Sequence, residues 1–250
     1  MRVSVLGNSD TTGLLLPPGT RTWPALLEEG LRGTLREPVT VDSWRFAPYR
    51  AGAVEHAVRL VDGAEPDLVI ITLASYWCGF GTVHARVAQR FGSRAARLFN
   101  RGERAYTQRV AGGVHEGRTD RSLGRRMARR VIGTQALMSL PQFVDVYSAL
   151  LRELALKEQR QVLVLADHHY TPEIHRMLPG LRGTIVEIEH AIKPIVVERK
   201  FLWGDLEEAI TEGGRREQMI LSDGIHMTEE AHGRVARALL PVVTMVAQPV

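Results

Sequence analysis

Short, mainly apolar runs alternate with segments of helical hydrophobic spacing along most of the chain. Residues 2–6, 68–73 and 161–166 form such runs, and their near-continuous apolar character is typical of parallel strands that helices cover on both faces. Residues 53–61 and 228–246 carry apolar side chains at the spacing of one helix face. Strands that alternate with helices predict an α/β fold built on one doubly wound, mostly parallel sheet.

Weaker patterns add further elements. Thr22, Trp23 and Pro24 predict the start of a helix that runs to about residue 31, because threonine is a good N-cap and proline suits the first turn. Residues 39–41 and 184–188 are predicted as short strands, the second from its alternating character. The remaining predicted helices lie at 142–159, 171–178 and 204–212.

Composition excludes several classes of protein. Of the 250 residues, 44% are hydrophobic and 24% are charged, which is the balance of a globular protein and not of a disordered or fibrous one. The single cysteine, Cys78, excludes an intrachain disulfide framework. The apolar runs fall far short of the roughly 20 residues of a membrane helix, and residues 1–7 lead into a strand pattern rather than a signal peptide. We therefore expect a cytoplasmic protein without a transmembrane segment.

A turn-rich motif follows the first predicted strand, where residues 7–13 read Gly-Asn-Ser-Asp-Thr-Thr-Gly. It places Ser9 at the carboxyl edge of the sheet, which is where open α/β folds hold their ligands. A serine on a sharp strand-to-helix turn has an exposed hydroxyl beside free backbone N–H groups, and this suits a nucleophile. The alternative is that Asn8, Ser9 and Asp10 only form a turn and a helix cap.

A second motif lies just before the last predicted helix, where residues 222–228 read Ser-Asp-Gly-Ile-His-Met-Thr. An aspartate three residues before a histidine can accept a hydrogen bond from one imidazole nitrogen. The other nitrogen is then free to take a proton from a nucleophile. The alternative is that Asp223 forms a turn, that Thr228 caps the helix and that His226 has no chemical role.

Together the two motifs resemble those of the SGNH, or GDSL-type, hydrolases. Residues 7–13 match the first block of that family, with Asn8 where aspartate is usual, and residues 223–226 match its Asp-x-x-His block. The resemblance implies a single domain over residues 1–250, folded as a three-layer α/β/α sandwich of the flavodoxin-like kind. It also implies Ser9 as nucleophile, His226 as general base and then acid, and Asp223 as the group that orients the imidazole. No metal and no organic cofactor are implied.

The middle blocks of the family match less well. Gly52 precedes the second predicted helix, at a plausible place for the glycine whose N–H binds the oxyanion. The third block usually contains an asparagine that donates to the same oxyanion, and here Tyr76 stands in its place, after Ser75. Loss of one such donor typically lowers turnover roughly 10²–10³-fold. Either a hydroxyl of Ser75 or Tyr76 replaces it, or two backbone N–H groups suffice for an activated substrate, or the protein is a weak or inactive member.

Other reactive side chains are assigned smaller roles. Cys78 has no Asp-x-x-His motif of its own and is interpreted as a core or loop residue. Asp167, His168, His169 and His175 follow a predicted strand, but their spacing matches no familiar metal motif. His168, His169 or Tyr170 could instead line the substrate pocket, because this strand also ends at the predicted edge.

Basic residues are concentrated in one segment. Residues 86–130 contain 13 Arg, no Lys and three acids, a local net charge of +10 in a chain whose total is +4. The arginines from 86 to 104 are spaced by three and four residues, so that an Arg-rich helical insertion or lid is predicted at about 83–131. Three interpretations stay open: a solvated face, a lid that attracts an anionic substrate or membrane surface, and a nucleic-acid interface. The last is disfavoured because aromatic residues are few.

The resemblance implies a serine hydrolase that cleaves small carboxylic esters or thioesters through an acyl-enzyme on Ser9. The alternative is a non-catalytic binding module with the same fold, whose Arg-rich segment holds an anionic ligand or partner. The intact Ser9, Asp223 and His226 favour the enzyme, whereas Tyr76 at the asparagine position favours the module. No prediction of an oligomer follows from the sequence.

Overall fold

The computed structural model separates the chain into two compact units, Met1–Ser75 with Leu140–Val250, and Tyr76–Ser139. The first unit contains the sheet and both sequence motifs. The predicted Arg-rich segment at about 83–131 lies largely outside the described residues. The three interpretations given for it therefore stay predictions. The residues that the structure describes are 1–14, 16–80, 86–87, 90–92, 94, 135–157, 160–168, 170–178, 180–211 and 216–247.

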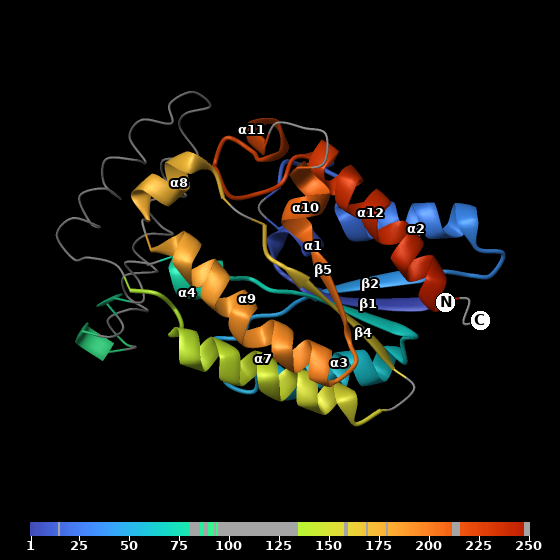
Figure 1. Ribbon diagram of the computed structural model, residues 1–250, viewed down its shortest axis with the longest axis horizontal. Helices are drawn as coiled ribbons and strands as arrows, with labels where there is room; N and C mark the ends of the chain where they lie inside the picture. Colours follow the sequence, from blue (N-terminus) through green and yellow to red (C-terminus); the bar gives the residue numbers. More distant parts are fainter. Residues whose placement is uncertain are drawn as a thin grey trace. The chain divides into compact units, whose positions relative to one another are not determined.

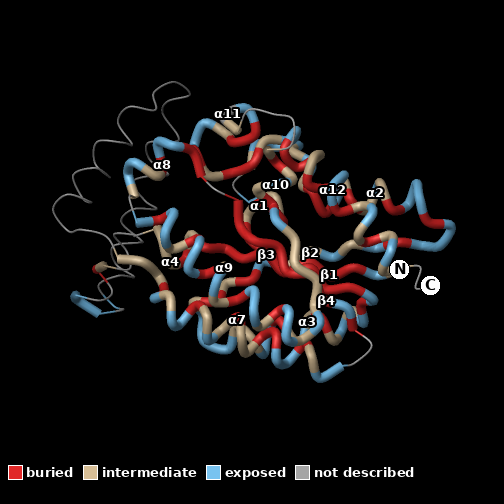
Figure 2. The backbone as a smooth tube through the Cα atoms, in the orientation of Figure 1, coloured by how far each residue is buried: buried red, intermediate tan, exposed pale blue. Residues whose placement is uncertain are grey.

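Within the described residues, one sheet of five parallel strands has the order β2-β1-β3-β4-β5. The three central strands are buried on both faces, as their apolar sequences predict, and Figure 2 shows them as the buried centre of this unit. The two edge strands have fewer apolar residues and are only partly buried. The strands are β1 (Arg2–Gly7), β2 (Thr40–Arg45), β3 (Leu68–Thr72), β4 (Gln161–Ala166) and β5 (Leu202–Asp205).

Helices cover both faces of the sheet (Figure 1). On one face α2 (Trp23–Thr34) and α12 (Glu229–Ala247) pack together, and α10 (Leu206–Thr211) packs beside α12. The other face carries α3, α7 and α9. The predicted three-layer α/β/α sandwich is therefore confirmed. The remaining helices, with the three on the second face, are α1 (Ser9–Thr12), α3 (Ala53–Ala64), α4 (Tyr76–Gly79), α7 (Leu140–Ala155), α8 (Pro172–Met177), α9 (Leu181–Glu198) and α11 (Arg216–Met219).

The order of the strands reverses at β1, because β2 lies on one side of it and β3 on the other. Such a switch point opens a crevice at the carboxyl ends of the strands, where doubly wound folds bind their ligands. Gly7 ends β1 at this point, and a Cβ there would lie only 2.7 Å from the Oγ1 of Thr72 on β3. Close approach of the two strand ends thus requires glycine directly before the Ser9 turn.

Two local predictions are wrong. The predicted strand at 184–188 lies within α9, because the buried Leu181, Ile185 and Ile188 recur at helical spacing, and β-branched side chains do not override that packing. The acidic helix predicted at 204–212 begins later, since Gly204 belongs to the edge strand β5. A Cβ on Gly204 would lie 2.7 Å from Leu165 Cδ2, so this glycine allows close packing of β5 against β4.

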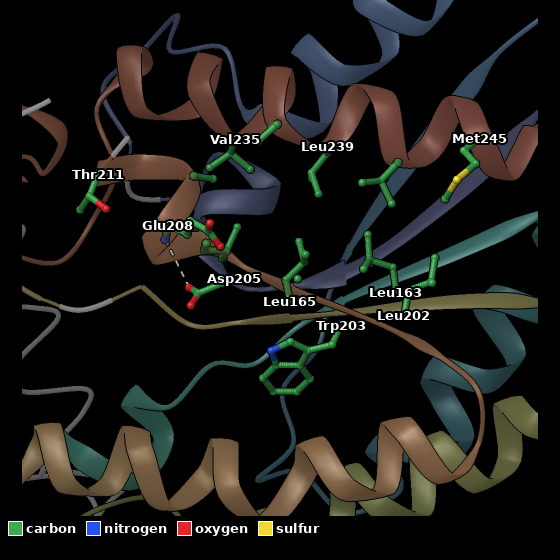
Figure 3. Close-up of a pocket in the computed structure, with 15 residues that line it drawn as sticks. Leu163, Leu165, Leu202, Trp203, Asp205, Glu208, Thr211, Val235, Leu239 and Met245 are labelled. Carbon is green, nitrogen blue, oxygen red and sulfur yellow. Dashed lines mark hydrogen bonds between the residues drawn. The ribbon is translucent and has the colours of Figure 1, made fainter. Parts of the chain in front are cut away.

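An apolar hollow of about 720 Å³ lies beside the edge strand β5. Side chains of β4, β5, α10 and α12 face one another across it, as Figure 3 shows. Among the described residues that line it there is none from the motifs at 7–13 and 222–228, so the hollow is separate from the candidate site.

Within the ranges that the structure describes, none of the helices combines the length and the hydropathy of a membrane span.

Candidate active site

The turn after β1 is held by its own side chains. The Oδ1 of Asn8, the N-cap of α1, accepts a hydrogen bond from the N–H of Asp10 at 3.0 Å. The hydroxyl of Thr11 donates to the carbonyl oxygen of Asn8 at 2.8 Å. Ser9 is therefore the first residue of a one-turn helix that ends at Gly13 in the left-handed conformation. This local capping holds the backbone of the turn that carries Ser9.

The loop before α12 brings Asp223 and His226 to the same place. Asp223 Oδ1 accepts hydrogen bonds from the N–H groups of Ile225 and His226, at 2.9 and 3.0 Å. Its Oδ2 lies 2.6 Å from His226 Nδ1. His226 Nε2 in turn lies 2.9 Å from the Oγ of Ser9, which is 217 positions away in the sequence. The three residues singled out by the two motifs are thus joined in the order serine, histidine, aspartate.

The pKa shifts of Asp223 and His226 are consistent with this order of contacts. Partial burial opposes ionisation of Asp223, but hydrogen bonds from the His226 ring and from two backbone N–H groups outweigh it and lower the pKa of Asp223 to about 2. Burial also acts to lower the pKa of His226, whereas its bond to Asp223 and the charges of Asp10 and Asp223 raise that pKa above its ordinary value. An ionised Asp223 can only accept, so Nδ1 carries the ring proton of neutral His226 and Nε2 is free to accept from Ser9.

Asp167, directly after β4, is a buried carboxylate with four hydrogen bonds. Its Oδ2 accepts from the N–H of Ser75 at 2.9 Å, from the hydroxyl of Ser75 at 2.6 Å and from the hydroxyl of Tyr170 at 3.1 Å. Its Oδ1 accepts from the N–H of His168 at 3.0 Å. Both donors of Ser75 are therefore directed at Asp167, and neither proton is left for an oxyanion in this arrangement.

The other two predicted oxyanion residues belong to different units of the chain, Gly52 to the first and Tyr76 to the second. Gly52 is the N-cap of α3, with φ 71°, and lines a cavity of about 390 Å³ together with Leu6, Phe46 and Arg50. Tyr76 begins α4 in the second unit, where its ring lies 4.1 Å from that of Trp77. The roles of Gly52 and Tyr76 as oxyanion donors stay predictions.

The structure defines the surroundings of three other residues that the sequence analysis considers, which are Cys78, His168 and Tyr170. Burial raises the pKa of the Cys78 thiol to about 12, which makes a reactive thiolate unfavourable at neutral pH. His168 and Tyr170 are buried, and their polar side-chain atoms contact Ile225 and Asp167 respectively. His169 lies outside the described residues. Among the residues that the structure describes, no three His, Cys, Asp or Glu side chains are grouped as metal ligands.

The sequence patterns did not indicate the buried groups that surround the triad. The sequence predicts only a turn or cap role for Asp10, yet its carboxylate is buried and Oδ1 accepts the N–H of Met227 at 3.1 Å. His232 on α12 is buried too, and burial lowers its pKa to about 4, so that it is neutral at pH 7. Two features of the sequence could have indicated such groups: an aspartate next to Ser9 and an Asp-His pair after β4. Each follows a strand whose carboxyl end lies at this edge of the sheet.

Comparison with solved structures identifies the fold. TesA is similar over 98% of this chain and 99% of its own, with 16% identity and a TM-score of 0.58. A lipase/acylhydrolase from Enterococcus faecalis is similar over 99% and 96%, with 14% identity and a TM-score of 0.59. A carbohydrate acetylesterase from Sinorhizobium meliloti is similar over 98% and 99%, with 14% identity and a TM-score of 0.56. No protein-family model and no curated protein matches the sequence.

The sheet order and the loops that meet at its carboxyl edge define a doubly wound α/β protein. More specifically, the chain has the fold of the SGNH hydrolases, and the resemblance seen in its first and last motifs is confirmed at that level.

Proposed function

We propose that the protein is a serine hydrolase that cleaves carboxylic esters or thioesters through an acyl-enzyme on Ser9. The observation that supports this most strongly is the unbroken path from Ser9 Oγ to His226 Nε2 at 2.9 Å and from His226 Nδ1 to Asp223 Oδ2 at 2.6 Å. A carboxylic-ester substrate is further supported by the similar structures, which include an acylhydrolase and an acetylesterase.

Each step has an assigned group. His226 takes the Ser9 proton on Nε2 as Oγ attacks the substrate carbonyl, and the N–H groups of Ser9 and Gly52 would donate to the developing oxyanion. His226 then gives the proton to the leaving oxygen or sulfur, which leaves the acyl group on Ser9. A water molecule, deprotonated by His226, attacks the acyl-enzyme, and His226 returns that proton to Ser9 Oγ as the C–O bond to the serine breaks and the acid leaves. Asp223 holds the imidazole in the required tautomer throughout.

A fluorophosphonate probe tests the proposal, since it reacts with an activated serine and not with an ordinary hydroxyl. We expect stoichiometric labelling, with the added mass on the peptide that contains Ser9, and no labelling of heat-denatured protein. Absence of label on the native protein, or label on another serine, would reject the hydrolase in favour of the non-catalytic binding module.

The leaving group should strongly affect the rate. Both protons of Ser75 are bound by Asp167, and an asparagine is missing from the third block, so few side-chain donors are available for the oxyanion. We expect aryl esters and thioesters to react at least about 100-fold faster than alkyl esters of the same acid, the order of the cost of one missing oxyanion donor. A series of acetate esters of graded leaving-group pKa measures this. Values of kcat/KM that do not vary along the series would contradict it.

A further inference from the structure

The backbone on both sides of His226 is held by two buried side chains from other parts of the fold. His168, which follows β4, has its Nε2 2.8 Å from the carbonyl oxygen of Ile225. Asp10, which follows Ser9, accepts the N–H of Met227 on its Oδ1 at 3.1 Å. A third contact joins the N–H of Thr171 to the carbonyl oxygen of Gly224 at 3.3 Å. The loop that carries the base is thus fixed from outside, immediately before and after His226.

The contact of His168 defines the protonation of its ring. A carbonyl oxygen only accepts, so Nε2 of His168 must carry a hydrogen and donate it to Ile225. On the other side of the ring, Nδ1 lies 3.4 Å from Asp167 Oδ1. Only 2% of His168 is exposed, so its ring is shielded from bulk water. The ring therefore lies between the Asp167 carboxylate, which is within ion-pair distance of Nδ1, and the loop of His226, to which Nε2 donates.

The groups that face His168 favour its charged form. Burial acts to lower the pKa of His168, but hydrogen bonding to Asp167 and the charges of Asp167 and Asp10 raise it to about 9. His232 of α12 is neutral at pH 7, and His226 on the loop is the other titratable ring nearby. A cation at His168 lowers the pKa of His226, in opposition to Asp10 and Asp223, which raise it.

We propose that His168 is a positioning residue, which holds the Ile225 carbonyl so that His226 faces Ser9, and which places a cation behind the loop that carries His226. The inference rests on the proposed function. It assigns two separable effects to one side chain: a hydrogen bond that acts on geometry, and a charge that acts on the base. Asp167 Oδ1 accepts the backbone N–H of His168 and lies 3.4 Å from its ring Nδ1, and Asp167 is itself held by Ser75 and Tyr170.

Two variants separate these effects. In H168Q the glutamine amide can donate from nearly the position of Nε2, but it is neutral. In H168L a side chain of similar bulk neither donates nor carries charge. We expect H168L to lower kcat about 10- to 100-fold, the order of a misplacement of about 1 Å in a catalytic group, with little change in KM. We expect H168Q to retain most of kcat. Both variants should move the acid limb of the rate to higher pH, because a positive charge near His226 is lost.

His190 provides the matched control, because it is an exposed histidine on α9. H190Q and H190L make the same chemical changes and should leave kcat and the pH profile as in the wild type. Equal loss of kcat in H168Q and H168L with an unchanged acid limb would show that His168 acts only in folding, and would overturn the proposal. So would wild-type behaviour of H168L.

A measurement without catalysis distinguishes failure of this inference from failure of the proposed function. The ring resonances of His226, assigned with a His226→Gln variant, are followed by NMR against pH in the wild type, H168Q and H168L. An upward shift of the His226 pKa in H168Q supports the role of the charge even if the native protein takes no fluorophosphonate label. An unchanged pKa overturns it, and H168Q alone decides this point if H168L does not fold.

Discussion

Replacement of Ser9 with alanine is expected to lower kcat roughly 10⁶-fold, because residues of a triad act as one unit and loss of the nucleophile removes the acyl-enzyme route altogether. The change removes one oxygen at a site that is only partly buried, so the fold should survive. Hydrolysis of an activated aryl ester measures the loss, and thermal unfolding of the variant checks the fold.

Ser43→Ala is the matched control for this experiment. Ser43 lies on the edge strand β2, is partly buried and is not part of either motif. Its variant should hydrolyse the ester at the wild-type rate. If Ser9→Ala kept more than a small fraction of the wild-type kcat, the acyl-enzyme would have to be sought on another residue, and the proposed mechanism would fall.

Asp223→Asn is expected to lower kcat about 10⁴-fold, because an amide no longer enforces the ring tautomer in which Nε2 accepts the serine proton. The shape of the pH profile should change as well. In the wild type the rate should rise with pH through the pKa of His226, which lies above 6.5, since only the neutral ring is a base. Asp223 stays ionised throughout this range, because its pKa is about 2. In the variant the bond and charge that raise the pKa of His226 are lost, so the acid limb should move to lower pH.

Profiles of kcat/KM between pH 4 and 9 measure both changes. Asp42→Asn, an exposed position on β2, makes the same chemical change away from the loop and should leave the profile unaltered. An Asp223→Asn variant with the wild-type acid limb and rate would mean that Asp223 does not contact the working base.

The main features of the candidate site were predictable because their determinants are local. Asp223 and His226 stand three residues apart in one loop, and their spacing alone allows the hydrogen bond seen at 2.6 Å. Ser9 needed only a strand followed by a sharp turn. That the two segments meet follows from the geometry of a doubly wound sheet, whose strands end at one edge.

Elements that depend on distant packing were not predictable in this way. The edge strand β5 is four residues long and only partly buried, so it has neither a continuous apolar run nor a clear alternation. The helical pattern of α9 was obscured by the β-branched Thr184, Ile185 and Val186, and only burial of its face at spacings of three and four residues reveals it. Side-chain preference is weak where tertiary packing decides.

The cluster around Asp167 and His168 depends on contacts across the sequence. His168 meets Ile225 over 57 positions, and Ser75 meets Asp167 over 92. No periodicity or short motif encodes such pairs. The same holds for Ser75. Its place after β3 makes its hydroxyl a candidate donor to the oxyanion, but its N–H and hydroxyl both donate to Asp167 at the end of the neighbouring strand β4.

Because Ser9 and His226 are 217 positions apart, the proposed site forms only when both segments are present in one folded chain. During synthesis Ser9 is made before Asp223 and His226, so in the proposed mechanism it has no base until those residues have been translated and folded. A nascent or prematurely ended chain that lacks α12 also lacks the partner of α2, against which that helix packs. Under the proposed mechanism, hydrolysis therefore requires the loop of Asp223 and His226 to dock against the Ser9 turn, so a chain cut before residue 223 would be inactive toward esters.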